Sequence, residues 1–270
     1  MLSATFAPLA SQLRCSATSA RPRVSCGREA DRPRPKGSKS SNMLQPLGPD
    51  LWLCDGPSVT GAGGFQFPTR MVVVRLPVEG GLWVWSPVAL TQDVRAAVDA
   101  LGSVRHLVAP NSLHHTCLAE WARSYPQARV HAAPGLTETA SGTAIHARLD
   151  DMTDTEWSGA LDQVVVLGNR ITTEVVFFHR ASATAIVTDW VQHIPRGGWR
   201  AVVARLDLMS AREPSVPRKF RLATTDRIAT RQTVQRILAW DAKRLVFAHG
   251  PALPAGRAET LRQAFAWLVR

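Results

Sequence analysis

The sequence lacks several features that would have assigned it to a class at once. It has no apolar run near the roughly 20 residues that a membrane helix needs, and its longest apolar stretches, such as 164–167, have the length of buried strands. Its four cysteines include no C-x-x-C pair, which gives no support to a disulfide framework or a cysteine zinc knuckle. The nucleophile elbow G-x-S-x-G, the P-loop and a G-x-G-x-x-G turn after a strand are also missing. We therefore expect no membrane span, and none of these common catalytic templates applies.

The net charge of +11 is unevenly distributed along the chain. Residues 1–42 hold six arginines and two lysines against Glu29 and Asp31, a net +6, which leaves +5 for the remainder. A second basic group, Arg212 and 218–221, falls in a segment that we expect to be a proline-containing loop. No basic helix with interleaved aromatic residues is present. The distribution favours a solvated basic surface with a basic tail and argues against nucleic-acid binding.

Residues 1–42 differ in composition from the rest of the chain. They are rich in Ser, Arg, Pro and Ala and contain no Trp, so we predict a disordered extension before a single domain at 43–270. The first 23 residues have the composition of an organelle transit peptide. The alternative is that the natural start is Met43. The first reading predicts an organellar protein and the second a cytoplasmic one.

The patterning after residue 50 predicts an α/β layered sandwich, because antiparallel-looking strands come first and strand–helix alternation follows. The expected strands are 51–54, 71–76, 82–85, 106–109, 129–132, 163–167, 173–178, 183–188 and 244–248. The expected helices are 92–101 with Thr91 as its N-cap, 113–125, 199–209, 226–240 and 256–269. The segment 135–156 is polar and weakly patterned, which indicates a loop or a short helix.

Potential metal ligands stand beside the ends of these elements. They are the pair His114-His115, then His179, Asp189 and His249. Ligands of open α/β sheets bind outside the carboxyl ends of the strands. Imidazole together with carboxylate suits zinc or iron better than magnesium or calcium, which prefer oxygen ligands. The pattern points to a metallohydrolase-like site without indicating a substrate.

Each of these residues also has a simpler interpretation. His249, which is followed by Gly250-Pro251, could be a hydrogen-bonded loop residue, and Asp189 could cap the next segment as an Asx turn. His179 and Asp189 would lie at opposite ends of a hairpin, so they converge only if the turn 180–182 folds over the sheet edge. His114 and His115 start a predicted helix and point roughly 100° apart, so one would be a ligand and the other an outer-shell partner.

Among the remaining polar residues, Glu174 opens a strand near His179. It could serve as a general base or as a hydrogen-bond acceptor behind the ligands, or it could simply lie on the surface. The other four histidines have no convergent setting in the sequence, and we expect them to be structural or exposed. These are His106, His131, His146 and His193.

The chain resembles a known family in the combination of four segments. They are Leu82-Trp-Val-Trp-Ser-Pro-Val88, Leu107-Val-Ala-Pro-Asn111 with His114-His115, the stretch from Val176-Phe-Phe-His179 to Thr188-Asp-Trp190, and Val246-Phe-Ala-His-Gly250. Together they look like a domain-of-unknown-function family related to the metallo-β-lactamase fold hydrolases, over about Pro46 to Val269. The resemblance implies a four-layer αββα sandwich of the metallo-β-lactamase type, with a site at the edge of its two sheets.

The same resemblance implies a set of ligands, with one departure. In the wider superfamily a strand leads into an H-x-H-x-D-H box, which matches the region 109–115 here. His115 takes the place of the final histidine and His114 that of the aspartate, while Pro110 and Ser112 replace the first two histidines. The later ligands would match His179, Asp189 and His249. The departure argues against a standard dinuclear zinc site and leaves a set for one metal, with Glu174 or His114 as proton acceptor.

Three functions follow as hypotheses. The first is a hydrolase-like protein with a mononuclear zinc or iron site, acting on an unknown small-molecule substrate. The second is a non-catalytic relative that has lost its metal box, holds no metal and binds a small molecule or a protein. The third and weakest is a basic nucleic-acid-processing protein, which would bind with a steep salt dependence.

Overall fold

The structure is a computed structural model, and it describes residues 44–60, 66–77, 81–154, 156–194, 200–253 and 258–269. The predicted extension at 1–42 and the glycine-rich loop at 61–64 lie outside the described residues.

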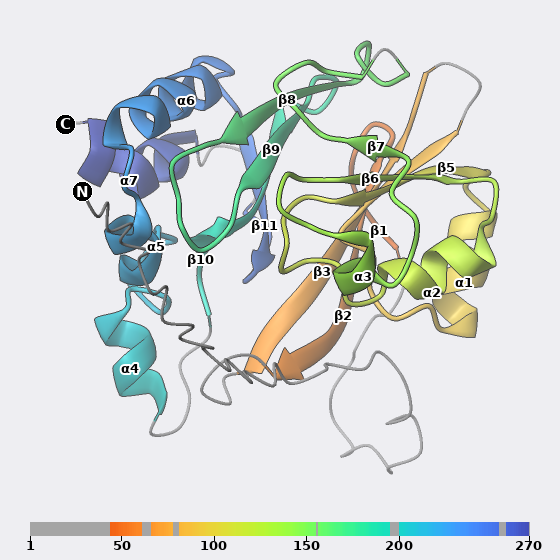
Figure 1. Ribbon diagram of the computed structural model, residues 1–270, viewed down its shortest axis with the longest axis horizontal. Coiled ribbons are helices and arrows are strands. Elements are labelled where there is room, and N and C mark those ends of the chain that lie inside the picture. The colour runs from red at the N-terminus through yellow and green to blue at the C-terminus, as the bar shows by residue number, and fades with distance from the viewer. Residues whose placement is uncertain are drawn as a thin grey trace, which may run out of the picture.

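Two β-sheets form the centre of the fold (Figure 1). The first has seven strands in chain order; β1 to β4 run antiparallel, and β4 to β7 run parallel. These strands are β1 (Gln45–Gly48), β2 (Leu51–Thr60), β3 (Gln66–Arg75), β4 (Leu82–Trp85), β5 (Val104–Ala109), β6 (Arg129–Ala132) and β7 (Ala147–Arg148). The second sheet has the order β11-β10-β9-β8, with β10 and β11 parallel and the other pairs antiparallel. Its strands are β8 (Leu161–Val166), β9 (Glu174–His179), β10 (Thr184–Gln192) and β11 (Arg244–His249).

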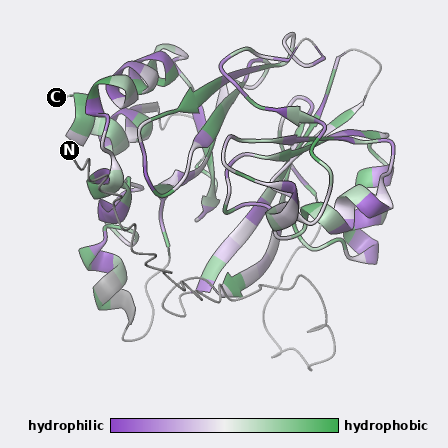
Figure 2. Ribbon diagram, viewed as in Figure 1, coloured by the Kyte–Doolittle hydropathy of each residue, from purple (hydrophilic) through white to green (hydrophobic). Residues whose placement is uncertain are grey.

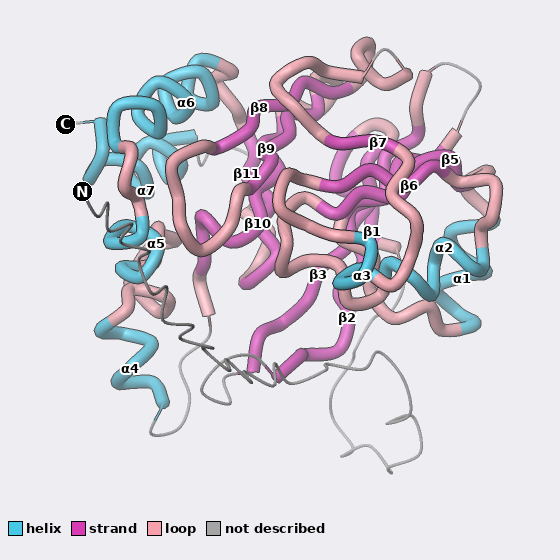
Figure 3. Tube along the Cα trace, in the orientation of Figure 1, coloured by secondary structure: helices cyan, strands magenta, loops and turns pink. Residues whose placement is uncertain are grey.

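Helices cover the outer faces of both sheets, as the secondary-structure colouring makes plain (Figure 3). On the seven-stranded sheet lie α1 (Gln92–Asp99), α2 (Leu118–Ser124) and the short α3 (Glu138–Ser141). On the side of the four-stranded sheet lie α4 (Arg200–Leu206), α5 (Arg218–Ala223), α6 (Arg227–Ala239) and α7 (Ala258–Val269). The helices carry both hydrophilic and hydrophobic residues (Figure 2), as expected of elements with one face in water.

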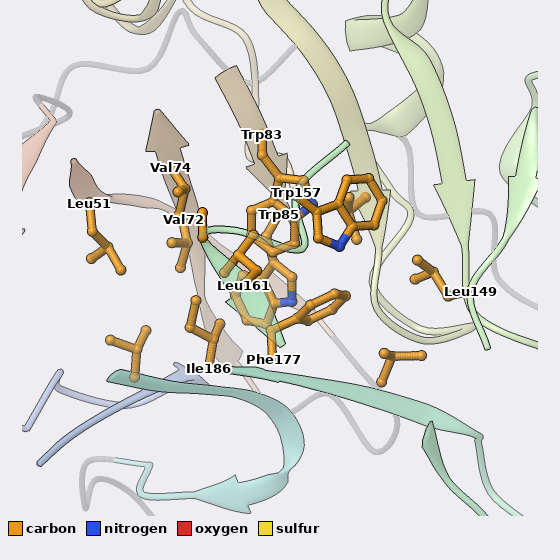
Figure 4. Packing of buried hydrophobic residues seen from close by; sticks show 14 of the residues in the cluster. Leu51, Val72, Val74, Trp83, Trp85, Leu149, Trp157, Leu161, Phe177 and Ile186 are labelled. Atoms are coloured by element: carbon orange, nitrogen blue, oxygen red, sulfur yellow. The ribbon is translucent and has the colours of Figure 1, made fainter. Parts of the chain in front are cut away.

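Three apolar clusters separate the four layers. The central one lies between the sheets and includes Trp83, Trp157, Phe177 and Ile186 (Figure 4). A second packs α1 and α2 on the first sheet, and a third packs α5, α6 and α7 on the second. The order is helix, sheet, sheet, helix, so the predicted four-layer αββα sandwich is confirmed.

Several local differences from the sequence prediction bear on the site. Helix α2 begins at Leu118 and not near residue 113, because Asn111 Oδ1 accepts hydrogen bonds from the backbone N–H groups of Leu113 and His114, at 2.8 and 3.0 Å, and holds that segment in a turn. The prediction that 218–221 is a loop was wrong, since α5 forms there, with Pro217 before its first turn. Strands β1 and β7 were not predicted.

No helix in the described ranges combines the length and the apolarity needed to cross a membrane.

Candidate metal centre

Three side chains from three different strand ends meet between the two sheets. His114 lies in the turn after β5, Asp189 lies in the last half of β10, and His249 is the final residue of β11. The Nε2 atoms of the two histidines are 3.2 Å apart. Asp189 Oδ2 is 3.4 Å from His114 Nε2, and Asp189 Oδ1 is 3.1 Å from His249 Nε2.

The 3.2 Å between the two nitrogens matches one edge of a metal coordination tetrahedron, and each nitrogen has a different oxygen of the Asp189 carboxylate at 3.1–3.4 Å. Four-coordinate zinc with bonds of about 2.0–2.1 Å keeps its ligand atoms roughly 3.3 Å apart. All three side chains are at most 9% exposed. Two imidazole nitrogens and a carboxylate are donors that zinc and iron accept. The residues therefore fit a single zinc or iron ion in both spacing and chemistry.

The outer nitrogens of both histidines are already engaged. His249 Nδ1 lies 2.8 Å from the carbonyl oxygen of Pro68, which can only accept, so this nitrogen donates and carries the proton. In neutral His249 the lone pair is then on Nε2 and faces the cluster. His114 Nδ1 pairs with Ser86 Oγ at 2.9 Å. Such partners fix the ring orientation of metal-binding histidines, and a carbonyl partner also fixes the tautomer.

Amide groups hold the carboxylate of Asp189 in place. Asn111 Nδ2 donates to Oδ2 at 2.8 Å, and Gln192 Nε2 donates to Oδ1 at 3.1 Å. Burial alone would raise the pKa of Asp189, but His114 and His249 hold that pKa well below its ordinary value. Burial, with His249 nearby, lowers the pKa of His114, whereas Asp189 acts to raise it. These directions favour an ionised Asp189 and an uncharged His114, the forms that bind a cation.

Glu174 explains how Asp189 comes to point inward. The pairing of β10 with β11 is regular up to Val187 and resumes at Gln192 after a shift in register. In that interval Glu174 accepts hydrogen bonds from the backbone N–H groups of Thr188, Asp189 and Trp190, at 2.6–3.2 Å. Burial, together with nearby Asp189, raises the pKa of Glu174 to about 8. The side chain replaces lost ladder partners and so positions the ligand strand.

The end of β11 is held by Gly250 and Arg70. Gly250 has φ of 147°, and a Cβ there would lie 2.4 Å from the ring of Phe247 and 2.6 Å from the carbonyl oxygen of His193, so no side chain fits. Arg70 donates to the carbonyl oxygens of Phe247 and Gly250. These contacts fix the backbone on both sides of His249.

The structure brings together some of the predicted site residues and separates others. Asp189 and His249 meet His114, which was expected as proton acceptor and lies in the cluster with them. His115, the expected ligand of that pair, is not in the cluster. His179 pairs across the hairpin with Thr184. Thr184 precedes Asp189 by five residues, which corresponds to about 17 Å along a strand. Its Nδ1 bonds Ser182 Oγ at 2.7 Å. The turn at 180–182 does not fold back over the sheet edge.

Asn111, Ser86 and Gln192 complete the site, and the sequence analysis did not single them out. Asn111 is fully buried and links the 112–114 turn to Asp189. An Asn directly after a strand and Pro110 is a common turn former, and that signal could have indicated its position. No local pattern marks Ser86 or Gln192, because their partners come from distant segments.

Comparison with known proteins agrees with this architecture. A family model described as domain of unknown function (DUF4336) matches residues 52–215, more than half of the chain. The chain belongs to this family. The matched segment contains His114 and Asp189 and ends before His249. No curated protein matches the chain.

Solved structures with the same fold are metallo-β-lactamase fold proteins. A metallo-β-lactamase from Erythrobacter litoralis is 16% identical with a TM-score of 0.59. The match covers 84% of this chain and 95% of that protein's chain. The mono-zinc form of the metallo-β-lactamase FIM-1 from Pseudomonas aeruginosa is 14% identical with a TM-score of 0.53, and the match covers 84% of this chain and 96% of that one. The Flv1 flavodiiron core from Synechocystis sp. PCC6803 is 10% identical with a TM-score of 0.58, and the match covers 84% of this chain and 60% of that one. At these identities the likeness shows the fold, and the resemblance drawn from the sequence motifs is confirmed at that level.

Proposed function

We propose that the DUF4336 protein is a metal-dependent, hydrolase-like protein with one metal held by His114, Asp189 and His249. The observation that carries the proposal is the meeting of two imidazole nitrogens, 3.2 Å apart, with a carboxylate whose two oxygens lie 3.4 Å from His114 Nε2 and 3.1 Å from His249 Nε2. Pro68 keeps the proton of neutral His249 on its outer nitrogen. Zinc or iron bound to three protein ligands keeps a position open for water or substrate.

A zinc or iron ion at this position would supply Lewis acidity, which polarises a carbonyl or phosphoryl oxygen and lowers the pKa of water. The protein residues do the rest by positioning. Asn111 and Gln192 orient the carboxylate of Asp189, and Ser86 and Pro68 orient the imidazoles. Buried Gln192 Oε1 has no hydrogen-bond partner among the described residues and is available to accept a hydrogen bond beside the site.

Glu174 acts in this proposal as a positioning residue and not as the general base. Both of its carboxylate oxygens accept backbone N–H groups, and the side chain is fully buried. A general base needs a free oxygen within reach of the proton that it removes. The proton acceptor, if the protein is catalytic, is a group other than Glu174.

The test is the zinc and iron content of the purified protein, compared with Asp189→Asn, His249→Ala and the matched control His115→Ala. The proposal predicts that the two ligand variants lose one metal equivalent, while His115→Ala keeps the wild-type content. A panel of chromogenic esters, phosphoesters and lactams then tests hydrolysis by the metal-loaded protein. Equal metal content in all four proteins would contradict the proposal.

A second candidate, a non-catalytic relative that binds a small molecule or a protein, is favoured by one observation. Pro110 and Ser112 occupy the positions of two histidines of the superfamily box. This candidate predicts no stoichiometric metal at His114, Asp189 and His249, and tolerance of Asp189→Asn and His249→Ala. The same metal analysis therefore distinguishes the two candidates.

A further inference from the structure

A second pair of buried histidines lies away from the candidate metal centre, on the face of the seven-stranded sheet that looks toward the other sheet. His106 is in β5 and His131 is in the neighbouring strand β6. Both are at most 5% exposed. The turn before β8 brings Glu156 to the same place, so that one donor atom from each of the three residues lies within 4.8 Å of the other two.

The spacing of the donor atoms again suits a metal ion. His106 Nδ1 is 3.1 Å from His131 Nε2 and 3.6 Å from Glu156 Oε2, close to the roughly 3.3 Å between the ligand atoms of tetrahedral zinc. His131 turns its other nitrogen, Nδ1, toward Asp154 Oδ2 at 4.0 Å. A carboxylate behind the outer nitrogen of a histidine is the usual second-shell partner of a metal-binding imidazole.

Burial lowers the pKa of both imidazoles, that of His131 to about 3. Neutral imidazole is the form that binds metals. Two carboxylates, Asp154 and Glu156, face the pair, and Arg129 lies 3.1 Å from Glu156 Oε2. A cation would therefore compete with Arg129 for this carboxylate.

The surroundings fix the geometry of the three donors. The ring of Trp157 packs edge-on against both imidazoles, with centroids 5.1 and 4.7 Å away. Its Nε1 donates to Gln163 Oε1 at 3.2 Å. The backbone N–H of Glu156 donates to Asp154 Oδ1 at 3.0 Å, which closes the turn. The donors thus come from a rigid sheet and from a turn that is anchored in the core, where Trp157 packs near Trp83 (Figure 4).

We propose that His106, His131 and Glu156 bind a second divalent cation of the zinc type, with Asp154 orienting His131. The ion would join the segment that carries Glu156 and Trp157 to strands β5 and β6. This site is independent of the centre at His114, Asp189 and His249, because the two share no residue.

The experiment is a titration of metal-stripped protein with cobalt(II), followed by visible absorption and calorimetry. Wild-type protein is expected to bind two equivalents. Glu156→Gln should weaken one of the two binding events by more than about 10-fold. Its side chain is 43% exposed, so the variant is expected to fold, and Glu259→Gln, which removes an exposed carboxylate on α7, is the matched control.

Arg129→Gln separates a metal site from a purely structural cluster. Loss of Arg129 frees Glu156 and removes a repelling charge, so cobalt affinity at this site should rise about two- to fivefold, the range expected for an exposed ion pair. A structural role alone predicts no gain in affinity.

The two sites are tested separately by the same titration. Asp189→Asn should remove the other equivalent and leave the one that depends on Glu156. The proposal is overturned if wild-type protein lacks an equivalent sensitive to Glu156→Gln, or if Glu156→Gln and Glu259→Gln behave alike, or if Arg129→Gln weakens binding.

Discussion

The two histidine clusters have similar spacing but differ in how their donors are prepared. In the cluster of His114, Asp189 and His249, the carboxylate is 6% exposed and two amides hold it. In the cluster of His106, His131 and Glu156, the carboxylate is 43% exposed and an arginine pairs with it. In the first, outer partners leave the lone pair of neutral His249 facing inward, whereas in the second the two imidazoles bond each other.

This difference shows that the distance between donors is not sufficient to rank two sites. A ligand that is already oriented loses little conformational freedom when a metal binds. Glu156 must leave Arg129 before it can bind, whereas Asp189 already faces the site. We therefore expect the cluster between the strand ends to bind zinc more tightly than the cluster on β5 and β6.

The largest expected effect is that of Asp189→Asn. Removal of the buried negative charge should weaken zinc binding at the first cluster by more than about 100-fold, the upper end of the cost of losing an outer-shell partner. The second cluster should keep its affinity. Calorimetric titration of metal-stripped protein measures both. Asp241→Asn, on an exposed turn, is the control, and equal zinc binding by the two variants would remove the distinction between the clusters.

Asn111→Ala should have the next largest effect. The change removes the amide that donates to Asp189 and the oxygen that shapes the turn before His114. Zinc affinity at the first cluster should fall about 10–100-fold. The kinetics and stoichiometry of zinc binding at the second cluster should stay unchanged. Competition with a fluorescent zinc chelator gives the affinity, and a loss confined to the second cluster would contradict the expectation.

Ser86→Ala is expected to cost less, about tenfold. It removes the hydroxyl at His114 Nδ1 and leaves Pro68 to orient His249. The same chelator competition tests it, with Ser158→Ala as a comparison variant on the surface. If Ser86→Ala weakened zinc binding more than Asn111→Ala did, orientation of the His114 ring would matter more than orientation of the carboxylate.

His179→Ala should leave zinc binding unchanged and lower the free energy of unfolding by about 1–3 kcal/mol, because it leaves the buried hydroxyl of Ser182 with one partner fewer. Urea unfolding and zinc titration measure the two quantities. A loss of zinc with retained stability would place His179 among the ligands, as the family pattern first suggested.

The sequence predicted the layers better than the contacts between them. Strand lengths and apolar runs indicated an α/β layered sandwich, because each buried strand is a local pattern, and the family resemblance implied its four-layer αββα form. Asp189 and His249, which lie together in the structure, were singled out for the same reason, since each follows or ends an apolar strand. Glu174 was offered as a hydrogen-bond acceptor behind the ligands, but the sequence could not choose that role over the others because it depends on a shift in the pairing of β10. The contact of Asn111 with Asp189 was not predicted, because the two residues are far apart in sequence.

Two predictions depended on pairings that the sequence does not show. His179 was placed in the site on the resemblance, but the hairpin register puts it at the far end of β10 from Asp189. His106 and His131 were expected to be structural or exposed, because nothing local reveals that β5 and β6 are neighbours with both rings on one face. Register and strand order are set by long-range packing.

The most direct test of the metal centre is a crystal of zinc-loaded protein with anomalous diffraction measured at the zinc absorption edge. We predict an anomalous peak about 2.0–2.2 Å from His114 Nε2, His249 Nε2 and one carboxylate oxygen of Asp189. A zinc peak bound instead by His115 or His179, or no peak within bonding distance of His114, Asp189 and His249 in a zinc-saturated crystal, would contradict the assignment.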